Sequence, residues 1–219
     1  VGYNYLEEKY EQSHEMYPDR VILGSENFPK EIGKRWPMVE KLPYVIGDFT
    51  WTAWDYIGEA GIGKSVFLDE GDPRLKTGPF ALMSYTSEFP WRLANDADFD
   101  INGNLLPQGE YRRIIWGKER LKVYSYDPGN FGKKELISPW GFTDVRKCWN
   151  WEGYEGKPVE VCVFSDAEEV ELFLNGKSVG RKKQGESPAA ERLEKSFLFQ
   201  IEYEPGVLEA VGSSGGEEW

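Results

Sequence analysis

Short apolar runs and longer amphipathic stretches alternate over the first part of the chain. The apolar runs occupy residues 1–5, 20–24 and 44–51. Their β-branched, aliphatic and aromatic composition is typical of strands, and the second run is typical of a strand buried on both faces. The stretches between them, residues 6–16 and 28–41, have the spacing of helices. This order of strand, helix, strand, helix and strand predicts βαβ units and a parallel sheet.

Each of the three predicted strands ends at a residue that could act in a site: Tyr5, Glu26 and Trp51. Their spacing suits successive units of a (β/α) barrel, in which the chemistry lies at the carboxyl ends of the strands. Glu26 directly follows a buried strand, where a carboxylate is costly to bury. At the mouth of a barrel it could act as a nucleophile toward the anomeric carbon of a sugar. The alternative is a glutamate favoured by the dipole at the start of a helix.

The two aromatic residues of this set can be read in two ways. A phenol such as Tyr5 can donate a hydrogen bond to a neighbouring carboxylate and fix its orientation. An indole such as Trp51 can form the flat floor of a sugar subsite. Alternatively, both rings are core residues that cap the barrel.

The regular rhythm stops after Trp51, and the region up to Pro107 is rich in Gly, Pro and acidic residues. Loops of this length at a barrel mouth are usually functional. Residues 111–122 (YRRIIWGKERLK) are predicted to form a closing helix, and residues 123–156 an irregular linker.

The pattern changes again after residue 157, where short strands follow one another closely. Strands are predicted at residues 159–164, 170–174 and 197–203. Asn175-Gly176 is the signature of a type I′ hairpin turn. Closely spaced short strands predict a β-sandwich of the immunoglobulin type over residues 157–219, which we expect to be truncated.

The stretch GEAGIGKS, residues 58–65, matches the phosphate-binding pattern GxxxxGK[ST]. Such a loop must lead into a helix whose N-terminal N–H groups meet the phosphates. The segments GDP and TGP that follow Ser65 exclude a helix of useful length. We therefore expect no nucleotide here: the glycines let the backbone turn near the candidate site, and Lys64 is an ordinary loop residue.

An acidic stretch, DFDING at residues 98–103, resembles the start of a calcium-binding loop. The acid required at the twelfth position is replaced by Gly109, and Glu110 comes one residue late. We interpret the stretch as an acidic turn. With the nucleotide pattern also set aside, the sequence predicts no cofactor and no metal.

Composition narrows the range of partners. The chain has 219 residues, is 40% hydrophobic and carries a formal net charge of -12. A real core is expected, and the negative field argues against nucleic acid. No stretch is long and apolar enough to span a membrane. Cys148 and Cys162 are expected to be two unpaired thiols.

Several of these segments resemble a known family. GYNYLEEKYEQSHEMYPDRVILGSEN and PYVIGDFTWTAWDYIGEAGIG are similar to the last third of the catalytic barrel of glycoside hydrolase family 2, which includes β-galactosidases and β-glucuronidases. EYRRIIWG resembles the final helix of that barrel. VEVCVFSDAEEVELFLNGKSVGR is similar to the immunoglobulin-like domain that follows the barrel in many members.

The resemblance implies an α/β plus all-β fold: strands six to eight of a TIM barrel over residues 1–122, then the linker and the sandwich. It implies that Glu26 is the catalytic nucleophile, that Tyr5 hydrogen-bonds it, and that Trp51 lines the subsite for the cleaved sugar. The family's acid/base glutamate, which follows an asparagine after strand four, has no counterpart here.

The function implied is that of a carboxy-terminal part of a retaining β-glycosidase, first of all a β-galactosidase, that is inactive alone. Specificity for β-glucuronides or β-mannosides is the nearest alternative. A carbohydrate-binding or scaffold module without chemistry is another. The expected partner is a carbohydrate, with neither nucleic acid nor membrane, and dimerisation is one way to cover the edges of a partial sheet.

Overall fold

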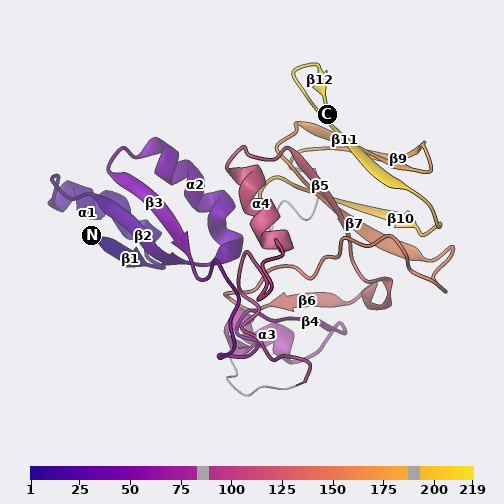
Figure 1. Ribbon diagram of the computed structural model, residues 1–219, viewed down its shortest axis with the longest axis horizontal. Helices are drawn as coiled ribbons and strands as arrows, with labels where there is room; N and C mark the ends of the chain where they lie inside the picture. The colour runs from indigo at the N-terminus through magenta and orange to yellow at the C-terminus, as the bar shows by residue number, and fades with distance from the viewer. Residues whose placement is uncertain (83–88, 187–192) are drawn as a thin grey trace. The chain divides into compact units, whose positions relative to one another are not determined.

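A computed structural model describes residues 1–82, 89–186 and 193–219 (Figure 1). Its secondary structure comprises four α-helices, four short 3-10 helices and twelve strands within those ranges. The first elements in chain order are β1 (Gly2–Asn4), η1 (Glu7–Lys9), α1 (Tyr10–Met16), β2 (Ile22–Asn27), η2 (Pro29–Glu31), α2 (Ile32–Lys41) and β3 (Val45–Thr50). The middle of the chain forms β4 (Ser65–Leu68), α3 (Arg74–Thr77), η3 (Pro79–Leu82), α4 (Pro107–Ile115), β5 (Leu121–Ser125), η4 (Pro128–Asn130) and β6 (Lys134–Ile137). The last strands are β7 (Pro158–Ser165), β8 (Glu169–Leu174), β9 (Lys177–Lys183), β10 (Ser196–Glu202), β11 (Leu208–Ser214) and β12 (Glu217–Glu218).

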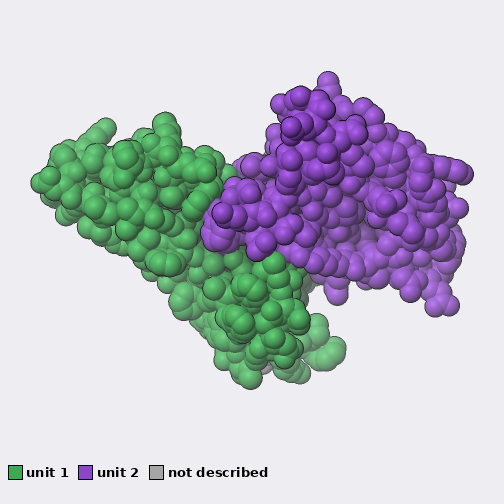
Figure 2. Space-filling model, turned by 45° about the horizontal axis from the view of Figure 1, so that its top comes forward, with its two compact units in different colours: residues 1–66, 73–109, 136–142 green, residues 67–72, 110–135, 143–219 purple. Residues whose placement is uncertain are grey.

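The chain divides into two compact units, which Figure 2 colours separately. Unit 1 comprises residues 1–66, 73–109 and 136–142, and unit 2 comprises residues 67–72, 110–135 and 143–219. Each unit therefore collects segments that are distant in sequence, whereas the predicted domains were consecutive stretches of chain.

The parallel sheet predicted for the first part of the chain is present in unit 1. Its strand order is β1-β2-β3, and both pairings are parallel. Tyr3 lies opposite Gly24, and Ile22 lies opposite Val45. The predicted βαβ pattern is thus confirmed for this region.

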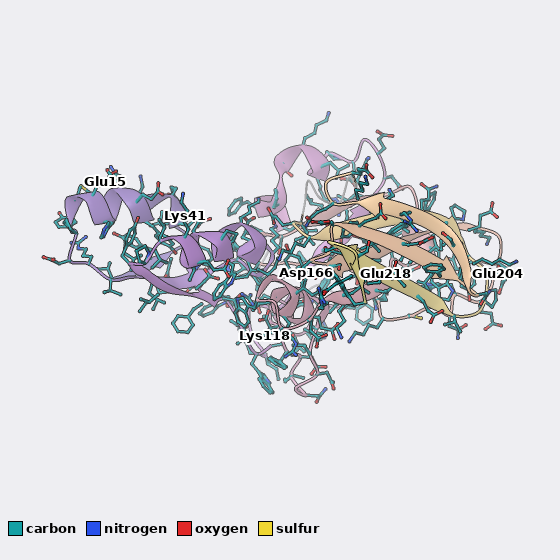
Figure 3. All side chains as sticks on the ribbon, turned by 90° about the horizontal axis from the view of Figure 1, so that it is seen from above. Glu15, Lys41, Lys118, Asp166, Glu204 and Glu218 are labelled. Carbon is teal, nitrogen blue, oxygen red and sulfur yellow. The ribbon has the colours of Figure 1, made fainter. Side chains whose placement is uncertain are left out.

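Helices α1 and α2 bury their apolar sides against this sheet. Tyr10 of α1 packs with Ile22, Leu42 and Val45 in one core cluster, and Met38 of α2 lies against it. Burial of such side chains is the main favourable term in folding, about 1.5–3 kcal/mol for each large aliphatic group. Glu15 and Lys41, labelled in Figure 3, are exposed on the same two helices.

The predicted closing helix at residues 111–122 is wrong in its second half. Helix α4 ends at Ile115, and Gly117 then adopts a left-handed φ of 64° while its N–H donates to the carbonyl of Ile114 at 3.0 Å. Glycine in this conformation is a common helix terminator. The following residues form β5, in which Val123 lies opposite Val163 of β7. They belong to a sheet of unit 2, and so neither to a helix nor to an irregular linker.

Unit 2 contains two antiparallel sheets, with strand orders β10-β7-β5 and β12-β11-β8-β9. One core cluster unites side chains from both, including Val161, Leu172 and Phe199. The two sheets therefore share one hydrophobic core. The turn at Asn175-Gly176 has φ values of 53° and 73°, the positive values that a type I′ hairpin requires.

No helix in the described part of the chain is long and apolar enough to cross a membrane.

Candidate functional site

The carboxyl edge of the parallel sheet in unit 1 gathers the three residues singled out by the sequence. Tyr5 follows β1, Glu26 is the penultimate residue of β2, and Trp51 follows β3. The backbone N–H of Tyr5 donates to the carbonyl of Glu26 at 2.9 Å, and that of Trp51 donates to the carbonyl of Asn27 at 3.0 Å. Parallel strands end at the same edge of a sheet, so the three residues share it.

Two side chains of β1 and its end hold the carboxylate of Glu26. The Tyr5 hydroxyl donates to Glu26 Oε1 at 2.7 Å, and Asn4 Nδ2 donates to Glu26 Oε2 at 3.3 Å. Asn4 is itself oriented by the Ser25 hydroxyl, which donates to Asn4 Oδ1 at 2.8 Å. Because each carboxylate oxygen has a donor, Glu26 is fixed in one orientation at the edge of the sheet.

Trp140 is a member of this network that the sequence did not predict. Its Nε1–H donates to the Tyr5 hydroxyl oxygen at 2.6 Å, across a separation of 135 residues. Phe28 completes an aromatic group, with ring centroids 4.3 Å from Tyr5 and 5.2 Å from Trp140. The Tyr5 hydroxyl accepts from Trp140, so its own proton is directed at Glu26.

Tyr5 keeps its proton well beyond neutral pH. Burial raises the pKa of its phenol, and the hydrogen bond to Glu26 raises it further. Since an ionised phenolate could not donate, the raised pKa keeps Tyr5 a hydrogen-bond donor to the carboxylate over the whole physiological range.

Trp51 is half-buried beside the same edge. Its ring meets the ring of Tyr56 edge to face, with centroids 6.4 Å apart and planes at 87°. The structure thus brings Trp51 to the strand edge that carries Tyr5 and Glu26, and its ring contact is with the loop that follows.

The GEAGIGKS segment forms a turn that leads into strand β4, so the helix required for nucleotide binding is absent here. Gly61 has a φ of 73°. A Cβ at Gly63 would lie 2.2 Å from the carbonyl oxygen of Asn95, so only glycine permits this close approach. Lys64 is 7% exposed, and is therefore buried rather than the ordinary loop residue that we expected.

The acidic stretch at residues 98–103 is a turn organised by its own carboxylate. Asp100 accepts hydrogen bonds from the backbone N–H groups of Asn102 and Asn104, each at 2.8 Å, and from the Asn104 side chain. These donors lower the pKa of Asp100. Among the residues that the structure describes, no group of three or more His, Cys, Asp or Glu side chains is arranged to hold a metal ion.

Comparison with known proteins gives three kinds of match. A family model described as a domain of unknown function, DUF4982, matches residues 156–219. A Formosa agariphila protein that carries the provisional name beta-glucuronidase is 26% identical over 184 residues, which is 84% of this chain and 13% of that protein. The beta-galactosidase BoGH2A of Bacteroides ovatus is 22% identical over 182 residues, covering 82% of this chain and 15% of that protein.

A solved structure agrees in fold over nearly the whole chain. A glycosyl hydrolase family 2 member from Bacteroides cellulosilyticus is 33% identical with a TM-score of 0.77, and the match covers 99% of this chain and 26% of that one. The chain therefore spans about a quarter or less of the length of the relatives that it matches.

These matches relate the chain to the β-glycosidases as a class. More narrowly, they confirm the resemblance to glycoside hydrolase family 2 that the GSEN and GDFTWTAWDY segments indicated.

Proposed function

We propose that this chain forms part of a retaining β-glycosidase in which Glu26 is the nucleophile. The observation that carries the proposal is the hydrogen bond from Tyr5 to Glu26 at the carboxyl edge of a parallel sheet. A half-buried carboxylate with a fixed orientation and a permanent phenol donor is suited to attack on a single carbon centre.

In this mechanism a Glu26 oxygen attacks the anomeric carbon and the bond to the leaving oxygen breaks, which gives a covalent glycosyl-enzyme. Water then releases the sugar. The Tyr5 hydroxyl orients the attacking carboxylate, and Trp51 provides an apolar surface for one face of the sugar ring.

The second carboxyl group of a retaining glycosidase lies about 5 Å from the nucleophile and protonates the leaving group. Its counterpart in the family follows a strand that this chain does not match, so we assign it to another part of a longer polypeptide.

We propose accordingly that the three parallel strands are strands six to eight of a TIM barrel and that the two packed sheets form an immunoglobulin-like sandwich. The 219-residue chain alone should then be inactive on nitrophenyl β-glycosides.

A neutral sugar, first of all a β-galactoside, is the proposed substrate. The carboxyl groups of Asp55 and Glu59 belong to the loop that follows Trp51, and the whole chain has a net charge of -12. Such a field disfavours an anionic substrate. A β-glucuronide is the second candidate, and the provisional name of the Formosa agariphila relative favours it.

The test compares two tyrosines of the same strand region in the longer polypeptide. Tyr5→Phe removes the donor to Glu26 and should lower kcat/KM roughly 10- to 100-fold, because hydrogen bonds to charged groups contribute about 1.5–3 kcal/mol. Tyr3 donates instead to Ser13 at 2.7 Å, so Tyr3→Phe should change kcat/KM by less than about twofold. Equal losses in the two variants would contradict the assigned role of Tyr5.

A further inference from the structure

Asp96 lies completely buried in the loop that packs against the segment after Trp51. Its Oδ1 accepts a hydrogen bond from the Thr52 hydroxyl at 3.2 Å, and its backbone carbonyl accepts from the Thr52 N–H at 3.3 Å. Thr52 is the neighbour of Trp51 in sequence. Asp96 therefore links this loop directly to the end of β3, where the candidate site lies.

The second oxygen of Asp96, Oδ2, is buried and has no hydrogen-bond partner among the described residues. The neighbouring Asp55 differs, because its Oδ1 accepts from the N–H groups of Tyr56 and Asn95, each at 2.9 Å. A charge on Asp55 is thus compensated by two donors. A charge on Asp96 would leave Oδ2 without a donor and would be costly at this depth.

Backbone packing keeps solvent away from Asp96. The N–H of Gly63 donates to the carbonyl of Ala94 at 2.9 Å, and a Cβ on Gly63 would lie 2.7 Å from the Cα of Asp96. The backbone at Gly63 therefore packs directly against the backbone of Asp96. Water cannot easily supply the hydrogen bonds that an ionised carboxylate would need.

The titratable groups around Asp96 oppose its ionisation. Burial has the largest effect and, together with the charges of Asp55 and Glu59, raises the pKa of Asp96 to about 7, although hydrogen bonds from the Thr52 hydroxyl and from the backbone N–H of Asp96 itself lower it. The charge of Asp96 in turn makes a minor contribution to the raised pKa of Tyr5 and of Tyr56. The charge of Asp96 therefore acts on Tyr5, the hydrogen-bond donor to Glu26.

We propose that Asp96 is a positioning residue that sets the alkaline limit of the candidate site. As a neutral acid it ties the loop to Thr52 and holds the segment after Trp51 in place. When it ionises, a buried negative charge without a cationic partner in the described part of the chain loosens this loop and adds negative charge that acts on Tyr5. The role in catalysis rests on the function proposed above, whereas the proposed coupling between Asp96 and Tyr5 can be tested on the chain itself.

The coupling is tested by NMR on the 219-residue chain, which needs no enzymatic activity. The side-chain carboxyl carbon of Asp96 should titrate with a midpoint at about pH 7. The Tyr5 ring resonances should shift with the same midpoint in the wild type and lose that step in Asp96→Asn. If Asp96 titrates in the ordinary range of an aspartate, or if Tyr5 does not follow it, the inference is wrong whatever the activity of the longer protein.

The catalytic consequence is tested in the longer polypeptide by pH–rate profiles. Asp96→Asn preserves a neutral acceptor for Thr52, so it should retain kcat at pH 5.5 within about threefold and lose the decline near pH 7. Asp96→Leu removes the acceptor and should lower kcat at every pH. An unchanged alkaline decline in Asp96→Asn, or equal losses in the two variants, would overturn the proposal. Absence of activity in the wild type alongside intact NMR coupling would count against the proposed function only.

Discussion

Replacement of Asp96 by Asn should change how the stability of the chain depends on pH. Folding raises the pKa of this carboxyl from 3.8 to about 7, so the native state binds the proton more tightly than the unfolded chain does. Protonated Asp96 therefore does not reduce the free energy of unfolding at acidic pH. As the pH rises from 3.8 to about 7, the free energy of unfolding falls, because ionised Asp96 is less favourable in the folded chain than in the unfolded one.

The size of the effect follows from the same shift. Each pKa unit corresponds to about 1.4 kcal/mol, so ionising Asp96 in the folded chain costs up to about 4 kcal/mol. Between pH 4.5 and pH 7.5 the wild type should lose about 3 kcal/mol of unfolding free energy on this account. The Asn side chain does not ionise and should not show this loss.

Urea unfolding of wild type and Asp96→Asn at the two pH values measures this difference directly. Other groups that titrate in the same range are common to both proteins, so they cancel when the change in the variant is subtracted from the change in the wild type. Exchange of the Asn95 amide hydrogen, which is bonded to Asp55, reports opening of the same loop in unit 1. Identical pH dependence in the two proteins would refute the reasoning.

Two further predictions concern packing and thiol reactivity. Gly63→Ala should destabilise unit 1 by roughly 2 kcal/mol or more, because the new Cβ would lie 2.2 Å from a backbone oxygen. In the control Gly47→Ala, the new Cβ would meet only the end of a leucine side chain at 3.3 Å, so the loss should be less than about 1 kcal/mol. Thermal unfolding measures the stability of both variants. Native chain should react rapidly with a thiol reagent at the exposed Cys148 and not at Cys162, which is buried and whose pKa is raised by burial. Rapid modification of Cys162 before unfolding would show that the antiparallel sheet around β7 opens easily.

The parallel sheet and strands β7, β8 and β10 could be predicted because their hydrophobic pattern is local. The run RVILG and the alternating segment VEVCVF each predict a strand without information from the rest of the chain. Strand β5 was missed because YRRIIWGKERLK keeps a helical composition past Gly117, and its partner β7 lies far along the chain. Pairing at that distance leaves no signal within the segment itself.

In the candidate site too, features with a local sequence pattern could be predicted, and contacts between distant residues could not. Tyr5, Glu26 and Trp51 could be named because strand ends fall at regular intervals in a βαβ pattern. The role of Trp140 could not, since its contact with Tyr5 spans 135 residues and arises only when the chain is folded. Asp96 could not be predicted for a related reason. A single aspartate in an acidic loop is expected to be exposed to solvent, and only the folded structure reveals its burial and its unpartnered oxygen.

The proposed activity depends most on Glu26 as the nucleophile. The direct test treats the longer polypeptide with a 2-deoxy-2-fluoro β-galactoside that carries an activated leaving group, and the labelled peptide is located by mass spectrometry. We predict one covalent sugar on Glu26, no labelling in Glu26→Gln, and normal labelling in Glu31→Gln, a glutamate of the following 3-10 helix. A label on another residue, or normal turnover by Glu26→Gln, would contradict the account.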